Sequence, residues 1–152
     1  YKEVHKKFPD RDLAYLCKRY STIFFPKWDK SKYLGGVHEY KRLELAKEID
    51  EECALKSASW GMFQIMGYHW KALGFASVVD FVMAMSESES QQLEIFVKFI
   101  QANKTLLNAI RAKDFDLFAL TYNGPDYRKN NYHVKMARAN NKYAYMNKVR
   151  NA

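Results

Sequence analysis

Apolar side chains in this sequence recur three and four residues apart, which is the spacing of one face of an α-helix. Leu13, Leu16, Cys17 and Tyr20 follow that spacing, and strict alternation of apolar and polar residues is scarce. Only three prolines and six glycines interrupt the 152 residues, so the many turns of a β-sandwich or barrel have little support. Because 48% of the residues are hydrophobic, the chain can bury a core of its own. We therefore predict an all-α protein.

The expected organisation is a single helical domain over residues 1–152, with about eight helices around one core. Residues 21–36 are expected to form an irregular connection that carries several large aromatic side chains. Side chains able to cap a helix start are found at Asp10, Ser77, Ser86, Asn103 and Asp114. The expected helical segments are 10–20, 37–52, 60–66, 68–73, 78–85, 87–102, 104–112, 115–122 and 131–149.

The net charge of +8 attracts polyanions, whether nucleic acid, an anionic membrane face or the bacterial envelope. The basic residues are scattered singly, unlike the dense block of a nucleic-acid-binding tail, and a merely soluble surface is an equally simple interpretation. The longest apolar runs are too short for a membrane span. No signal peptide is visible, which predicts a cytoplasmic protein until its release or export. Because the first residue is Tyr1, we expect an N-terminal segment to precede it.

Motifs for cofactor and metal chemistry are missing from the sequence. A glycine-rich phosphate loop and a Gly-x-Ser-x-Gly elbow are both absent. The four histidines are spread without ligand-like spacing, and the two cysteines, Cys17 and Cys53, lie among apolar neighbours. We expect free thiols, no metal ion and no cofactor.

The segment Ser57-Ala-Ser-Trp-Gly-Met-Phe-Gln-Ile-Met-Gly67 is the first candidate functional region. Its apolar residues predict a short buried helix, in which Gln64 is the only amide. Gly61 allows a ligand or another backbone to approach closely, and Gln64 can both donate to and accept from the acetamido and hydroxyl groups of a sugar. The structural alternative is a packed helix whose glutamine bonds to backbone.

The segment Tyr122-Asn-Gly-Pro-Asp-Tyr127 is the second candidate region. Tyr122 and Asn123 would place a phenol and an amide at the rim of a groove, which suits sugar rings. The alternative is helix-stop chemistry, in which Asn and Gly adopt left-handed conformations before a proline.

Together the two segments resemble the N-acetylmuramidase domain of bacteriophage endolysins, over about residues 33–143. More distantly, Gly-x-x-Gln-Ile at 61–65 with Tyr-Asn-Gly at 122–124 is similar to the paired signature of goose-type lysozymes and lytic transglycosylases. The resemblance implies a lysozyme-like α fold and cleavage of the bond between N-acetylmuramic acid and N-acetylglucosamine in peptidoglycan. It further implies that the two segments face one cleft, whose substrate-binding residues are Ser59, Trp60, Gln64, Tyr122 and Asn123.

The implied activity needs a glutamic acid that stays protonated near neutral pH in an apolar pocket. The resemblance implies that this acid lies in a Glu-Ser-Gly segment and that a second glutamate lies in a Phe-Glu-x-His segment. Both segments are expected ahead of Tyr1. Within the chain, Glu39 is the first candidate, although a carboxylate in the first turn of a helix has its pKa lowered. Glu3 is the second candidate. Glu52 is expected to be solvated.

The leading hypothesis is a monomeric, muramidase-type peptidoglycan hydrolase that acts on the bacterial cell wall without nucleic-acid binding or membrane insertion. Hydrolysis by water, rather than attack by the sugar's own hydroxyl, is the family expectation. A peptidoglycan-binding module that keeps the groove but lacks the acid is the first alternative. A basic helical nucleic-acid binder is the second alternative, and the helix-face spacing of the aromatic residues disfavours it.

Overall fold

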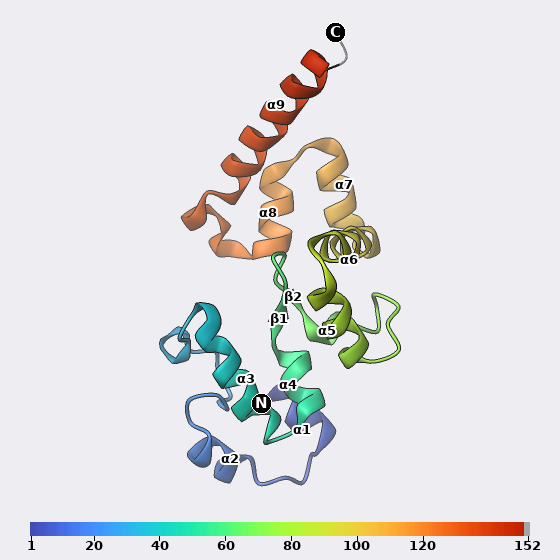
Figure 1. Cartoon of the computed structure of the whole chain (residues 1–152). Helices are drawn as coiled ribbons and strands as arrows, with labels where there is room; N and C mark the ends of the chain where they lie inside the picture. The colour runs from blue at the N-terminus through green and yellow to red at the C-terminus, as the bar shows by residue number, and fades with distance from the viewer. Residues whose placement is uncertain (151–152) are drawn as a thin grey trace. The chain divides into compact units, whose positions relative to one another are not determined.

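The computed structural model describes residues 1–150 of the chain. These residues form two compact units, unit 1 (Tyr1–Phe96) and unit 2 (from Val97 onward), and each is described by itself (Figure 1). Nine α-helices, four short 3₁₀ helices and one hairpin of two-residue strands occur among the described residues. The predicted all-α class is therefore confirmed for the described residues, and the expected number of helices was nearly right.

Unit 1 contains the helices around the N-terminus, a small hairpin and the first part of a longer helix (Figure 1). One apolar cluster joins its first helices and the following loop through Val4, Leu16, Phe24, Ile49 and Cys53. The elements of unit 1 are α1 (Lys2–Lys7), α2 (Leu13–Arg19), η1 (Lys30–Lys32), η2 (Gly36–His38), α3 (Glu39–Lys47), α4 (Glu51–Ser57), β1 (Ser59–Trp60), β2 (Ile65–Met66), η3 (Gly67–His69) and α5 (Val78–Glu87). The helix α6 (Glu89–Ala102) begins in unit 1 and runs into unit 2.

Unit 2 is built from helices that pack in chain order, with α7 against α8 and α8 against α9. Its buried side chains lie on the inner faces of α7, α8 and η4, and they are Leu106, Ala109, Phe118, Ala119 and Tyr127. The elements are α7 (Lys104–Ala112), α8 (Phe115–Asn123), η4 (Pro125–Asn130) and α9 (Tyr132–Arg150). None of the helices described in the two units is long and apolar enough to cross a bilayer.

Three of the five predicted helix caps are confirmed. Ser77 accepts a hydrogen bond from the Asp80 amide at 3.1 Å, and Asn103 and Asp114 cap α7 and α8 in the same way. For the other two helices, the observed cap lies two residues after the predicted one. Asp12 rather than Asp10 caps α2, and Ser88 rather than Ser86 starts α6, where it accepts from the Gln91 amide.

The predicted helix 37–52 is divided in two by Asp50. Its backbone is extended, and its carboxylate accepts a hydrogen bond from the Cys53 amide at 2.8 Å. An aspartate in this position ends one helix and caps the next. The result is that α3 stops at Lys47 and α4 starts afresh at Glu51.

The predicted buried helix 60–66 was wrong, because the segment forms an antiparallel hairpin. Ser59 pairs with Met66 and Trp60 with Ile65. Gly61 and Gln64 both have positive φ, 67° and 53°, which closes a tight turn and cannot continue an α-helix. A short apolar run fits a strand as well as a helix, so periodicity could not separate the two.

Candidate functional site

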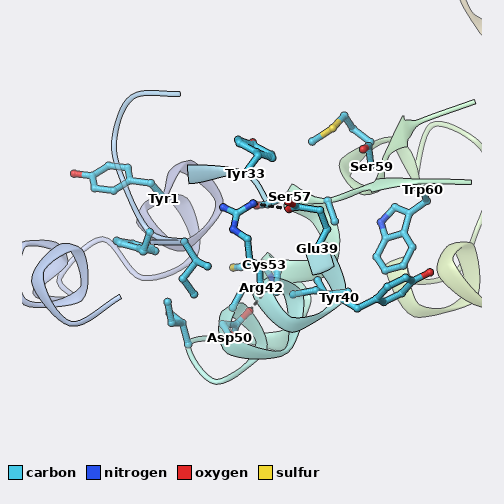
Figure 2. Close-up of a pocket in the computed structure, with 18 of the residues that line it drawn as sticks. Tyr1, Tyr33, Glu39, Tyr40, Arg42, Asp50, Cys53, Ser57, Ser59 and Trp60 are labelled. Atoms are coloured by element: carbon cyan, nitrogen blue, oxygen red, sulfur yellow. Dashed lines mark hydrogen bonds and ion pairs between the residues drawn. The ribbon is translucent and has the colours of Figure 1, made fainter. Parts of the chain in front are cut away.

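A pocket of about 720 Å³ lies in unit 1, among α3, α4, the hairpin and the loop before α3 (Figure 2). Four of the residues predicted from the sequence line it together, namely Glu39, Ser59, Trp60 and Gln64. The remaining lining includes the aromatic side chains of Tyr1, Phe24, Phe25, Tyr33 and Tyr40. The pocket therefore combines aromatic faces with a few polar groups, as small-molecule sites generally do.

Glu39 is held by three hydrogen-bond donors at the start of α3. Its Oε1 accepts from the amides of Leu34 at 2.6 Å and Gly35 at 2.8 Å. Its Oε2 accepts from Nη1 of Arg42 at 2.5 Å, and Figure 2 shows the guanidinium reaching toward the carboxylate. The carboxylate thus ties the loop before α3 to the helix that follows.

These contacts keep Glu39 ionised. Desolvation by itself would raise the pKa of Glu39, but the bonds from Gly35, Arg42 and Leu34 together outweigh it and hold the pKa below its usual value. A proton donor in glycoside cleavage needs the opposite shift. The environment of Glu39 fits a structural carboxylate better than a general acid.

Arg42 connects three parts of the pocket wall. Its guanidinium lies 4.5 Å from the centroid of the Tyr33 ring, and its Nη2 donates to the carbonyl of Thr22 at 3.2 Å. With the pair to Glu39, these contacts fix the aromatic ring of Tyr33 at the pocket.

The hairpin forms another part of the lining, and Ser59 and Gln64 in it form hydrogen bonds within the hairpin. The hydroxyl of Ser59 donates to Oε1 of Gln64 at 2.7 Å, and Nε2 of Gln64 donates to the carbonyl of Gly61 at 2.9 Å. Trp60 donates its indole N–H to the carbonyl of Leu55 at 3.0 Å. The prediction of a buried Gln64 was wrong, because the residue is exposed in the turn.

The tip of this hairpin is fastened by Gln92 on α6. Its Oε1 accepts from the Met62 amide at 2.9 Å, and its Nε2 donates to the carbonyl of Met85 at 2.8 Å. A Cβ on Gly61 would lie 2.6 Å from Cε of Met85 and 2.8 Å from Oε1 of Gln92, so side chains approach Gly61 closely, where a ligand or another backbone was predicted to do so. Gln92 thereby positions the turn that presents Gln64.

The other sequence candidates lie elsewhere. Glu3 is in the first turn of α1, where its neighbours Tyr1 and Val4 line the pocket. Glu52 keeps 42% of its side chain exposed, in line with the expected solvation, and it pairs with Lys56 and with Lys7 at 2.8 Å. These bonds lower the pKa of Glu52.

Tyr122 and Asn123 belong to unit 2, at the end of α8. The Tyr122 ring stacks on Phe118 and meets Phe99 edge-on, each at 5.8 Å between centroids. Burial raises the pKa of Tyr122 to about 12, and Asn123 is exposed. Gly124 ends the helix with φ 80°, whereas Asn123 belongs to α8 and does not have a positive φ, so the left-handed pair predicted by the helix-stop alternative was wrong for Asn123. That these two residues share a cleft with Gln64 stays a prediction.

Cys17 and Cys53 are free thiols, as expected. Burial, with a smaller effect of Asp50, raises the pKa of Cys53 to about 12. Within residues 1–150, no three side chains of His, Cys, Asp or Glu are grouped so as to hold a metal ion.

An all-α fold with an aromatic and polar pocket beside a small hairpin belongs to the lysozyme-like class. A family model described as "Muramidase: N-acetylmuramidase" matches residues 1–144, and the chain belongs to this family. The crystal structure of the Burkholderia AP3 phage endolysin is similar over 95% of this chain, with 42% sequence identity and a TM-score of 0.86. The match covers 53% of that endolysin, so the chain spans about half its length. No curated protein matched the sequence.

Proposed function

We propose that this chain is a peptidoglycan hydrolase that cleaves the glycosidic bond between N-acetylmuramic acid and N-acetylglucosamine, with a glutamate as general acid. Membership of the N-acetylmuramidase family supports peptidoglycan hydrolysis in general. The observation that carries the proposal is the pocket, which Ser59, Trp60 and Gln64 line together with Tyr33 and Tyr40.

The pocket walls suit a glycan. Aromatic rings such as Tyr33 and Tyr40 offer flat apolar faces to the C–H surface of a sugar ring, while their hydroxyls reach polar groups. Gln64 can donate to and accept from an acetamido group, and its bond from Ser59 orients it for this role. In the proposal, Tyr122 and Asn123 of unit 2 also bind sugar.

The general acid of this proposal is a glutamate other than Glu39. The donor must be protonated at neutral pH before it can pass its proton to the leaving oxygen, and Glu39 is held as a carboxylate. We assign Glu39 to positioning, because it orders the loop that carries Tyr33. The family resemblance implies a Glu-Ser-Gly segment as the source of the acid, and Glu3 remains a candidate within the chain.

The rest of the proposal concerns the reaction and its setting. Water, rather than the 6-hydroxyl of the muramic acid, attacks the sugar carbon, so the product is a reducing sugar and not a 1,6-anhydro sugar. The protein acts as a monomer on the bacterial cell wall.

One specific observation favours the alternative of a binding module without catalysis. In the described part of the chain, both glutamates with a clear pKa shift, Glu39 and Glu52, have it lowered. A pocket that keeps its sugar contacts and lacks a proton donor would bind glycan strands without cutting them.

The test is digestion of purified cell walls by the intact protein that carries these residues. After borohydride reduction of the soluble products, mass spectrometry is expected to find reduced muramic acid at the new ends. Reduced glucosamine at those ends would overturn the bond specificity, and 1,6-anhydro ends would overturn hydrolysis. Walls that bind the protein but gain no new ends would establish the binding module instead.

A further inference from the structure

The net charge of the chain is confined to one of its two units. Residues 1–96 hold 14 basic and 14 acidic side chains, so unit 1 is neutral. Residues 97–152 hold 11 basic and 3 acidic side chains, which accounts for the whole charge of +8. A positively charged surface that binds anions is therefore expected on unit 2.

Within unit 2, α9 concentrates this charge. The helix carries five basic residues and no acidic one, so none of its cations has an acidic partner on the same helix. Its second half, residues 141–150, is exposed throughout. Figure 1 shows that this part of α9 extends past the end of α8.

Three of the five cations lie on the face of α9 that points away from its neighbours in unit 2. The half-buried residues His133, Met136 and Asn140 follow a spacing of three and four, which marks the face packed on the rest of unit 2. Lys135, Arg138 and Lys142 follow the same spacing on the opposite side and are exposed. Three positive charges therefore project into solvent along about two turns of helix.

The same exposed side continues with apolar residues. Tyr145, Met146 and Val149 are 70%, 41% and 61% exposed, and they lie in line with the three cations. Because cations and apolar groups share one side, the helix lacks the separate apolar face that inserts into a bilayer. This distribution of side chains favours binding of a flexible polyanion over insertion into a bilayer, because the negative groups of such a polymer can reach the exposed cations from solution.

We propose that the exposed face of α9 formed by Lys135, Arg138 and Lys142 is a docking surface for the carboxylates of peptidoglycan stem peptides. The inference rests on the proposed function, because that function makes this polymer the substrate. Stem peptides carry free carboxylates along every glycan strand, so the surface would hold the protein on its substrate between cleavage events.

The test measures binding of the intact protein to insoluble cell walls in a cosedimentation assay at about 50 mM and about 200 mM salt. The triple variant Lys135→Gln/Arg138→Gln/Lys142→Gln is compared with Lys18→Gln/Lys41→Gln/Lys71→Gln, which removes the same charge from exposed positions of unit 1. The α9 variant is expected to bind about tenfold or more weakly at low salt, while the control stays within about twofold of the wild type. An equal loss in both variants would overturn the α9 surface.

Amidated cell walls identify the ligand chemistry. Conversion of wall carboxylates to amides with carbodiimide and ammonia is expected to weaken wild-type binding to the level of the α9 variant. Unchanged binding to amidated walls would overturn the carboxylate assignment. Loss of binding to DNA or to phosphatidylglycerol vesicles in the α9 variant, without loss on walls, would assign the surface to that other polyanion.

The same samples separate this inference from the proposed function. At saturating protein and high salt, the α9 variant is expected to release new reducing ends at the wild-type rate. A wild type that binds walls through α9 but releases no reducing ends would refute the hydrolase and leave the docking surface standing. If the α9 variant binds and cleaves walls as well as the wild type even at low salt and limiting protein, the docking surface is refuted and the hydrolase stands.

Discussion

At the scale of single residues, hydrogen bonds lower the pKa of Glu39 by more than its partial burial raises it. Two amides and a guanidinium converge on one carboxylate, and a carboxylate that accepts several such bonds is stabilised in its charged form. The helix start at Glu39 could be inferred from the sequence. The two amide bonds could not, because they depend on the fold of the loop at Leu34 and Gly35.

The variant Glu39→Gln is expected to lower the free energy of unfolding at pH 7 by about 1 kcal/mol, given the partial exposure of the group. Because the folded pKa of Glu39 lies below its unfolded value, its stabilisation is present above about pH 4.3 and is lost as the pH falls through the folded pKa. Urea unfolding of wild type and variant from pH 7 to pH 3 should show the difference shrinking toward zero. The exposed Glu44, changed to Gln, serves as a control with little difference at any pH.

The variant Gln92→Ala tests the fastening of the hairpin tip. It leaves the Met62 amide and the Met85 carbonyl without their partner and is expected to cost about 1–3 kcal/mol. Hydrogen exchange followed by NMR should show faster exchange at the Met62 amide, whereas Gln91→Ala should leave it unchanged. Equal protection of Met62 in all three proteins would argue against the role of Gln92.

At the scale of elements, side-chain caps were the most predictable feature and the hairpin was the least. Ser77, Asn103 and Asp114 act within three residues of themselves, so a local pattern was sufficient. The hairpin depends on Gln92, which is 30 residues from Met62. No local sequence pattern contains that contact. A glycine at position 61 can adopt a positive φ in any fold, so its presence did not by itself predict the hairpin.

Gly67 closes the base of the hairpin, and its replacement has a predictable cost. A Cβ at this position would lie 2.1 Å from the carbonyl oxygen of Leu55, so Gly67→Ala should force α4 and β2 apart. We expect a loss of about 3 kcal/mol or more in urea unfolding. Gly74→Ala is the control for added bulk, because nothing lies within 4 Å of its Cβ position, although φ is positive at Gly74 and not at Gly67. It should cost only about 1 kcal/mol of backbone strain.

At the scale of the whole molecule, the net charge was visible in the sequence but its distribution became meaningful only with the structure. The basic residues are scattered along the sequence. Once the chain is divided after Phe96, unit 1 has no net charge and unit 2 carries all of it. The candidate residues divided in the same way. Glu39, Ser59, Trp60 and Gln64 share one pocket, whereas Tyr122 and Asn123 belong to the other unit, so their common cleft remains a prediction.

The hairpin is anchored at both ends, at its tip by Gln92 and at its base by Gly67. Moving one strand past the other by a single residue would turn each side chain of that strand to the opposite face. Such a slip would break the Met62 bond and drive a side chain into the Leu55 carbonyl. The two residue pairs of the hairpin are too few to fix the strand register by themselves. The contacts at Gln92 and Gly67 hold them in a single register, so Trp60 and Gln64 keep their orientation.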